Sequence, residues 1–323
     1  MGTGETSDAA KIRLGISSCL LGNNVRWNGG HTRDRFLTDT LGKYVEYVGV
    51  CPEVECGLPI PREPLRQVGD PEAPRLVTRE SGTDLTDQMV VWARQRVVEL
   101  ETEHLCGFIF MSRSPSSGME RVKVYNEHGV PEKKGVGVFA RIFMNHFPLL
   151  PVEEDGRLHD PKLRENFVER IFALKRWREA LAEGRTRGNL VAFHTAHKLL
   201  IMAHSPKHYR AMGPLVAHAK EAEPSALFAD YERLLLEALK LRATPSKHAN
   251  VLHHMLGYFK AQLSADEKQE ALELVEQYRH ELVPLVVPVT LFSHFVRKYD
   301  QAYLKGQAYL HPHPLELQLR NHV

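Results

Sequence analysis

Residues 83–118 read "TDLTDQMVVWARQRVVELETEHLCGFIFMSRSPSSG", and this stretch decides the fold class. Apolar residues recur at helical spacing over 90–100, and Thr83 or Asp84 can cap the helix that this spacing predicts. A short apolar run follows at 106–111 and predicts a buried strand, which ends in a loop of serine, proline and glycine. Alternating helix and strand indicate an α/β domain with a mostly parallel, Rossmann-like sheet.

The first half of the chain repeats this texture. Further strands are expected at 13–22, 45–54 and 122–126, and a further helix at 34–43. From about residue 156 the pattern becomes helical throughout, and Ser264 with Glu267 forms a capping box. The helices expected there are 160–183, 188–203, 207–221, 224–242, 247–262, 265–281 and 288–304.

Length and composition favour an ordinary soluble protein of two domains. With 323 residues, the chain exceeds the size at which one core stops growing, and it is 43% hydrophobic and 25% charged. No apolar stretch reaches the roughly 18–20 residues that span a bilayer, and the start lacks the features of a signal peptide. We therefore expect a cytoplasmic protein with a disordered tail (1–11), a catalytic α/β domain (12–150) and an all-α domain (156–323). The boundary is expected in the proline-rich, acidic stretch 146–157.

Charge is divided unevenly between the two halves. Residues 1–155 carry 18 Lys and Arg against 22 Asp and Glu, a net charge of −4, whereas residues 156–323 carry 24 against 18, a net charge of +6. This asymmetry favours a polyanionic partner for the second half, although a solvated helical surface explains it equally well.

The four cysteines all lie in the first third of the chain, where a reducing compartment argues against disulfides. Cys19 and Cys51 follow predicted strands and are separated by 31 residues, enough for a crossover to a neighbouring strand. Cys56 and Cys106 are better explained as small core residues. Two convergent thiols do not complete a zinc site, which needs four ligands.

Two further features mark the same predicted edge of the sheet. Glu53 lies two residues after Cys51 and is either an acid/base group or a carboxylate at a helix start. The loop "SPSSG" (114–118) read alone suggests a cradle for an anion, built from hydroxyl and backbone N–H groups.

Three blocks resemble the thiouracil desulfurase family: "ISSCLLGNNVRWNGGH" (16–31), "VGVCPEVECGLPIPRE" (48–63) and "SRSPSSGMERVKVYN" (112–126). The stretch "FHTAHKLLIMAHSPKHYRAMGPLVAHAK" (193–220) resembles the YbgA-like helical domain that is commonly fused behind it. The fused form is similar to RNA 4-thiouridine desulfidases, which convert 4-thiouridine in tRNA to uridine.

The resemblance implies a 4Fe–4S cluster that three cysteines hold, with one iron open for the sulfur of the substrate. By position two ligands are Cys19 and Cys51, and the third cysteine position is occupied by Ser117. Because a hydroxyl oxygen is a poorer iron ligand than a thiolate, this departure predicts a cluster that is held weakly or not at all. The resemblance also assigns acid/base work to Glu53, with Ser112 or Ser114 as a second polar group.

The same comparison predicts an RNA surface and leaves competing explanations open. His194, His197 and His204 are candidates for a zinc site, but packing or hydrogen bonding explains them better. Residues expected to contact RNA, each with a surface ion pair as the alternative explanation, are Arg26, Arg121, Lys123, Lys198, Lys207, His208, Tyr209 and Arg210.

The leading hypothesis is therefore a non-redox, iron–sulfur-dependent desulfidase that acts on 4-thiouridine in tRNA. One alternative is a free-base thiouracil desulfurase, and another is an RNA-binding module that is inactive because Ser117 replaces a ligand cysteine.

Overall fold

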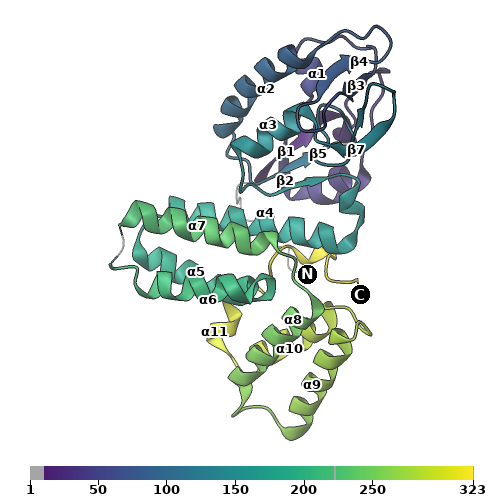
Figure 1. Ribbon diagram of the computed structural model, residues 1–323. Helices are drawn as coiled ribbons and strands as arrows, with labels where there is room; N and C mark the ends of the chain where they lie inside the picture. Colours follow the sequence, from purple (N-terminus) through teal and green to yellow (C-terminus); the bar gives the residue numbers. More distant parts are fainter. Residues whose placement is uncertain (1–10, 222, 323) are drawn as a thin grey trace. The chain divides into compact units, whose positions relative to one another are not determined.

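The computed structural model describes residues 11–221 and 223–322, so the tail expected at 1–11 lies outside the described residues apart from Lys11. The chain divides into two compact units between His159 and Asp160 (Figure 1). This division lies just after the stretch 146–157.

The first unit is built on a four-stranded sheet in which every neighbouring pair of strands is parallel. Its strands, in spatial order, are β2 (Val45–Val50), β1 (Ile12–Ser17), β5 (Phe108–Phe110) and β8 (Val152–Glu154). The expected α/β class is confirmed. The edge strand β8 was not predicted, because it lies in the proline-rich, acidic stretch that resembles a linker.

A second sheet of the same unit is mixed, with antiparallel outer pairs around one parallel pair. Its strands, in spatial order, are β4 (Arg75–Thr78), β3 (Leu65–Val68), β6 (Val122–Tyr125) and β7 (Pro131–Gly135). The strand expected at 122–126 is therefore β6, which lies outside the parallel sheet.

Helices α2 (Thr86–Glu101) and α3 (Val138–His146) pack on one face of the parallel sheet (Figure 1). The aromatic core lies beneath them, where the ring centroids of Phe108 and Phe143 are 4.6 Å apart. Helix α2 begins later than the sequence predicts, because Asp84 Oδ1 accepts the N–H of Thr86 at 2.9 Å.

The helix expected at 34–43 is replaced by two tighter and wider turns. Phe36–Thr40 forms a π-helical turn, and Leu41–Lys43 forms a 3₁₀ turn. A short helix, α1 (Pro52–Glu55), follows β2 and ends the expected strand at Val50.

The second unit is helical, and no strand occurs among residues 160–221 and 223–322. Four of its helices begin with a polar cap followed by proline, as at Asp160–Pro161 and Thr244–Pro245, because proline fits the first helical turn. The capping box at Ser264 is confirmed. The helices are α4 (Pro161–Ala182), α5 (Arg187–His204), α6 (Pro206–Ala217), α7 (Pro224–Lys240), α8 (Pro245–Leu256), α9 (Ala265–Arg279), α10 (Val286–Lys298) and α11 (Ala302–Lys305). Within the described residues, none of the helices has the length and apolar character that crossing a bilayer requires.

Candidate functional site

A cavity of about 310 Å³ lies at the carboxyl edge of the parallel sheet, where residues that follow β1, β2 and β5 line its wall. This is the edge at which α/β sheets bind their ligands. Seven of the residues predicted from the sequence line this single cavity, namely Cys19, Arg26, Cys51, Glu53, Ser112, Ser114 and Ser117.

Glu53 is held by contacts to both of its carboxylate oxygens. Ser116 Oγ donates a hydrogen bond to Oε1, while Oε2 lies 3.5 Å from Cys51 Sγ and 3.8 Å from a guanidinium nitrogen of Arg62. The Arg62 side chain is 7% exposed and also donates to Val25 O at 3.0 Å, so it is fixed in place. The carboxylate is thereby oriented beside the thiol.

The two cavity thiols are in environments that disfavour the thiolate. Burial, reinforced by the charge of Glu53, raises the pKa of Cys51 to about 12. Burial also raises the pKa of Cys19, although a hydrogen bond with Thr32 opposes the shift. Both groups are therefore protonated at neutral pH unless a metal replaces the proton.

The loop after β5 contains a chain of hydroxyl groups that leads to Glu53. Ser114 Oγ lies 2.9 Å from Ser116 Oγ, and because Ser116 donates its proton to Glu53, Ser114 is the donor to Ser116. Ser116 is fully buried. The sequence did not single out Ser116, because serines in such a loop are equivalent until the fold gives one of them a carboxylate partner.

Ser112 has a different partner. Its hydroxyl donates to Asp155 Oδ1 at 2.7 Å, and its N–H donates to the same oxygen at 2.7 Å. Asp155 follows β8, so a fourth strand end contributes to this edge of the sheet. The sequence analysis missed Asp155 because it missed the strand before it.

Ser117 is 2% exposed, and its Oγ lies 2.8 Å from the Oγ of Ser17, at the end of β1. Cys19, Cys51 and Ser117 together offer two sulfurs and one oxygen to the same cavity. Iron–sulfur clusters are usually held by four thiolates. This donor set fits a cluster bound through two sulfurs and one oxygen, with one iron free of protein ligands.

The serine loop is anchored to α3 by backbone contacts. Phe139 N–H donates to Ser116 O at 2.8 Å, and Gly137 N–H donates to Gly118 O at 2.7 Å. A Cβ at Gly137 would lie 2.6 Å from backbone atoms of Ser116 and Ser117, so only glycine permits this approach. The buried side chain of Gln67 also donates to Pro115 O at 2.8 Å.

The cavity also carries an aromatic residue and two cations. Trp27 is 44% exposed, an unusual state for a large apolar side chain. Arg26 and Arg113 line the same cavity, and neither forms an ion pair with any residue that the structure describes. These groups match the planar, anionic character of a nucleotide.

Comparison with known proteins agrees with both units. A family model described as 2-thiouracil desulfurase matches residues 14–155, and one described as a protein of unknown function, DUF1722, matches residues 198–314. The chain is 34% identical over 153 residues to the uncharacterized protein YbgA of Escherichia coli (strain K12), which covers 47% of this chain and 90% of YbgA. The chain belongs to the YbgA family. It carries a 2-thiouracil desulfurase domain ahead of its DUF1722 domain, so the expected fusion is confirmed.

Among solved structures, a [4Fe-4S]-dependent thiouracil desulfidase, TudS, aligns with 29% identity and a TM-score of 0.39, covering 46% of this chain and 95% of that one.

Several predicted residues of the desulfurase domain lie away from the cavity. Arg121 is an exposed side chain beside Glu120, and Lys123 is exposed on β6 of the second sheet. Neither Cys56 nor Cys106 is among the lining residues. Cys106 precedes β5 and is buried, and Cys56 Sγ donates to Glu53 O at 3.3 Å. Neither thiol can take the place of Ser117.

In the DUF1722 domain the predicted basic and aromatic residues lie along α5 and α6. Lys198 Nζ lies 4.7 Å from the centroid of the Tyr303 ring, which stacks on Tyr258. Lys207 and Arg210 are exposed, whereas Tyr209 is half-buried. His208 is tied to Ser205 Oγ at 2.7 Å.

The histidines that suggested zinc have separate partners. His194 Nδ1 contacts the Tyr231 hydroxyl at 3.2 Å, and His197 Nε2 accepts from Arg176 at 2.9 Å. His204 Nε2 donates to Glu169 at 3.0 Å. Burial lowers the pKa of His194 to about 4 and that of His197 to about 3, so both are neutral packing residues.

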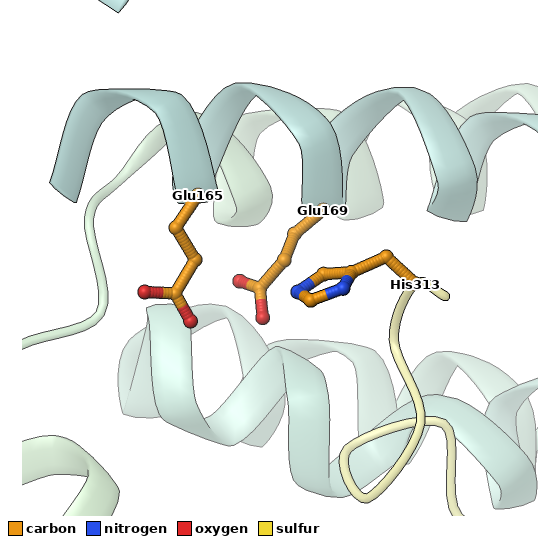
Figure 2. A group of neighbouring side chains, drawn as sticks. All are labelled: Glu165, Glu169 and His313. Carbon is orange, nitrogen blue, oxygen red and sulfur yellow. The ribbon is translucent and has the colours of Figure 1, made fainter. Parts of the chain in front are cut away.

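Glu165 and Glu169 on α4 and His313 bring possible ligand atoms within 4.8 Å of one another (Figure 2). The four carboxylate oxygens already accept hydrogen bonds from three side chains, namely Arg320, His204 and His322. A guanidinium in the centre of the group supplies the positive charge that a cation would bring. This cluster is a closed network of ion pairs.

Proposed function

We propose that this protein removes sulfur from 4-thiouridine in tRNA, leaving uridine in the RNA and releasing hydrosulfide. The desulfurase domain belongs to a family of enzymes that act on the C–S bond of a thiolated pyrimidine. The observation that carries the proposal is the single cavity in which two thiols, a serine hydroxyl and an oriented glutamate lie together.

The reaction balances as a hydrolysis. Water forms a bond to C4 of the base while the C4–S bond breaks, and one proton from the water and the hydrosulfide account for the remaining atoms. No electrons are gained or lost, so no reductant is needed. Cys19, Cys51 and Ser117 would hold an iron–sulfur cluster, which when bound supplies a Lewis-acidic iron for the sulfur.

The protein groups supply proton transfer and orientation. Glu53 accepts the proton of the attacking water, because its carboxylate is oriented by Ser116 and Arg62 at the cavity wall. Ser114 faces the cavity and is connected to Glu53 through Ser116, so a proton can pass along this chain to the departing sulfur or the ring nitrogen.

The RNA part of the proposal is supported by the surface groups. Arg26 and Arg113 line the cavity without carboxylate partners in the described chain, and Trp27 offers a face for a base. The net charge of +6 over residues 156–323 favours contact of the DUF1722 domain with phosphates. Lys198, Lys207 and Arg210 are the cations that we assign to this contact, with His208 and Tyr209 beside them.

The test is anaerobic cluster reconstitution followed by incubation with tRNA that contains 4-thiouridine. Loss of the thiolated nucleoside is followed by mass spectrometry of digested RNA, in parallel with the free base and the free nucleoside. We expect conversion of tRNA by the wild type and loss of conversion in Glu53→Gln, with the exposed Glu63→Gln as the matched control.

Two outcomes contradict the proposal. Faster conversion of the free base than of tRNA supports a free-base thiouracil desulfurase. Salt-sensitive tRNA binding without sulfur release under any metal loading supports an RNA-binding module.

A further inference from the structure

We propose that Ser117 is an oxygen ligand of the iron–sulfur cluster and that Ser17 is the residue that positions it. This inference rests on the cluster of the proposed function. It assigns to the chain a cluster site with two sulfur ligands and one oxygen ligand, supported by a second hydroxyl behind the oxygen.

The hydrogen bonds fix the direction of the serine pair. Met111 N–H donates to Ser17 Oγ at 2.9 Å, so Ser17 has a backbone donor and keeps its own proton for another acceptor. The nearest acceptor is Ser117 Oγ at 2.8 Å. Both serines are almost completely buried, at 3% and 2% exposed, so water does not compete for this contact.

The remaining proton and lone pair of Ser117 are then free for a ligand. Its backbone N–H is already used by Ser114 Oγ at 3.1 Å, and Ser117 lines the cavity together with Cys19 and Cys51. On binding, the O–H bond of Ser117 is replaced by an O–Fe bond and one proton leaves to solvent, without electron transfer. The Ser17 hydroxyl then donates to an anionic oxygen, which strengthens that hydrogen bond.

The other thiols do not offer an alternative third ligand. Cys56 and Cys106 are absent from the cavity wall, and Cys56 is bonded to the backbone of Glu53. An oxygen ligand is harder than a thiolate, so it weakens the hold on iron without removing it. The structure therefore points to a labile cluster with one oxygen-bound iron.

The experiment compares the anaerobically reconstituted full chain with S117A, S117C and S17A, and uses S18A as the matched control. Ser18 is the neighbouring serine on the same cavity wall. Iron and sulfide per chain, the lifetime of the visible absorption against a chelator, and the ⁵⁷Fe Mössbauer spectrum are measured.

We expect S117A to lose iron roughly 10- to 100-fold faster than wild type, and S17A to lose it roughly 10-fold faster. S117C should retain iron longest, and S18A should match the wild type. The Mössbauer spectrum of the wild type should contain one iron site with an oxygen ligand, which S117C removes and S17A keeps.

The inference is overturned if S117A keeps iron as long as the wild type, or if the wild type and S117C give the same iron spectrum. It is also overturned if the wild type and S117C both bind no iron. An unchanged iron lifetime in S17A removes Ser17 from it. If iron binds as described but no sulfur is released from any thiolated pyrimidine, the ligand assignment stands and the proposed function fails.

Discussion

Glu53 is the residue at which three separate segments of the desulfurase domain meet. Its helix α1 follows β2, the Ser116 hydroxyl comes from the loop after β5, and Arg62 comes from the segment before β3. Because each segment contacts a different part of the carboxylate, the direction of the two oxygens is set before a substrate binds. Such preorganisation is what a proton acceptor in a closed cavity requires.

Ser116→Ala should separate positioning from substrate binding. Glu53 loses the hydroxyl donor on Oε1, while the cavity wall is unchanged because Ser116 does not line it. We expect kcat to fall on the order of 100-fold with KM nearly constant. Steady-state kinetics on thiolated RNA measure both, and the exposed Ser81→Ala is the control. An unchanged kcat, or a change confined to KM, contradicts the relay.

Cys51 should react slowly with alkylating reagents in the cluster-free protein. Its pKa, raised to about 12 by burial and by Glu53, leaves little thiolate at pH 8, so the rate should still be increasing at pH 10. Glu53→Gln removes the neighbouring negative charge, lowers the pKa and should accelerate alkylation at each pH. Iodoacetamide labelling read by peptide mass spectrometry, in a Cys56→Ser background, measures this rate. A plateau below pH 9 contradicts the prediction.

Elements with one dominant physical signal were predictable, and elements shaped by tertiary contacts were not. Helix α2 and strand β5 follow from apolar periodicity, and the helices of the DUF1722 domain follow from polar caps followed by proline. Strand β7, "PEKKG", is mostly exposed and has no apolar pattern. Strand β8 buries Glu154, which is tolerated because its Oε1 accepts the N–H of Met119 at 2.6 Å. Sequence alone does not show such a partner.

The same limit applies to the site. The strand-end position of Cys19 and Cys51 is readable from the sequence, because parallel strands end at a common edge. The relay through Ser116 and the bond between Ser17 and Ser117 join residues up to 100 positions apart, and no local pattern encodes them.

Gly137→Ala tests the contact between α3 and the serine loop. The backbone φ at this position is −58°, which alanine adopts readily, so any cost is steric. The new methyl group would meet backbone atoms of Ser116 and Ser117, and we expect a loss of about 1–3 kcal/mol in the free energy of unfolding. Gly213→Ala in α6, where a methyl group meets nothing within 4 Å, should instead stabilise the protein by about 0.5–1 kcal/mol. Urea unfolding measures both, and equal effects contradict the steric explanation.

At the scale of the whole molecule the two domains place their polar groups differently. The desulfurase domain gathers its buried polar groups around the cavity, as with Ser116 and Ser117. The DUF1722 domain places them in its core, where Arg320 pairs with Glu165 and Glu169. Since breaking a buried pair is far more costly than breaking an exposed one, the second domain depends more on the protonation state of its interior.

The DUF1722 domain should therefore lose stability on mild acidification. Burial lowers the pKa of His194 to about 4 and those of His197 and His248 to about 3, whereas an unfolded histidine titrates near ~6.5. Between these values the unfolded chain binds protons that the folded domain excludes, so stability is full above about pH 7 and falls as the pH decreases. Each histidine costs about 2 kcal/mol at pH 5.

Hydrogen exchange of the α5 and α8 amides at pH 7.5 and pH 5, corrected for intrinsic rates, measures this loss in the intact chain. His197→Gln keeps a polar group beside Arg176 and removes one titrating site, so it should reduce the pH dependence by about 2 kcal/mol at pH 5. The exposed His128→Gln should leave it unchanged. Protection that is constant or stronger at pH 5 would show that these histidines accept protons in the folded domain.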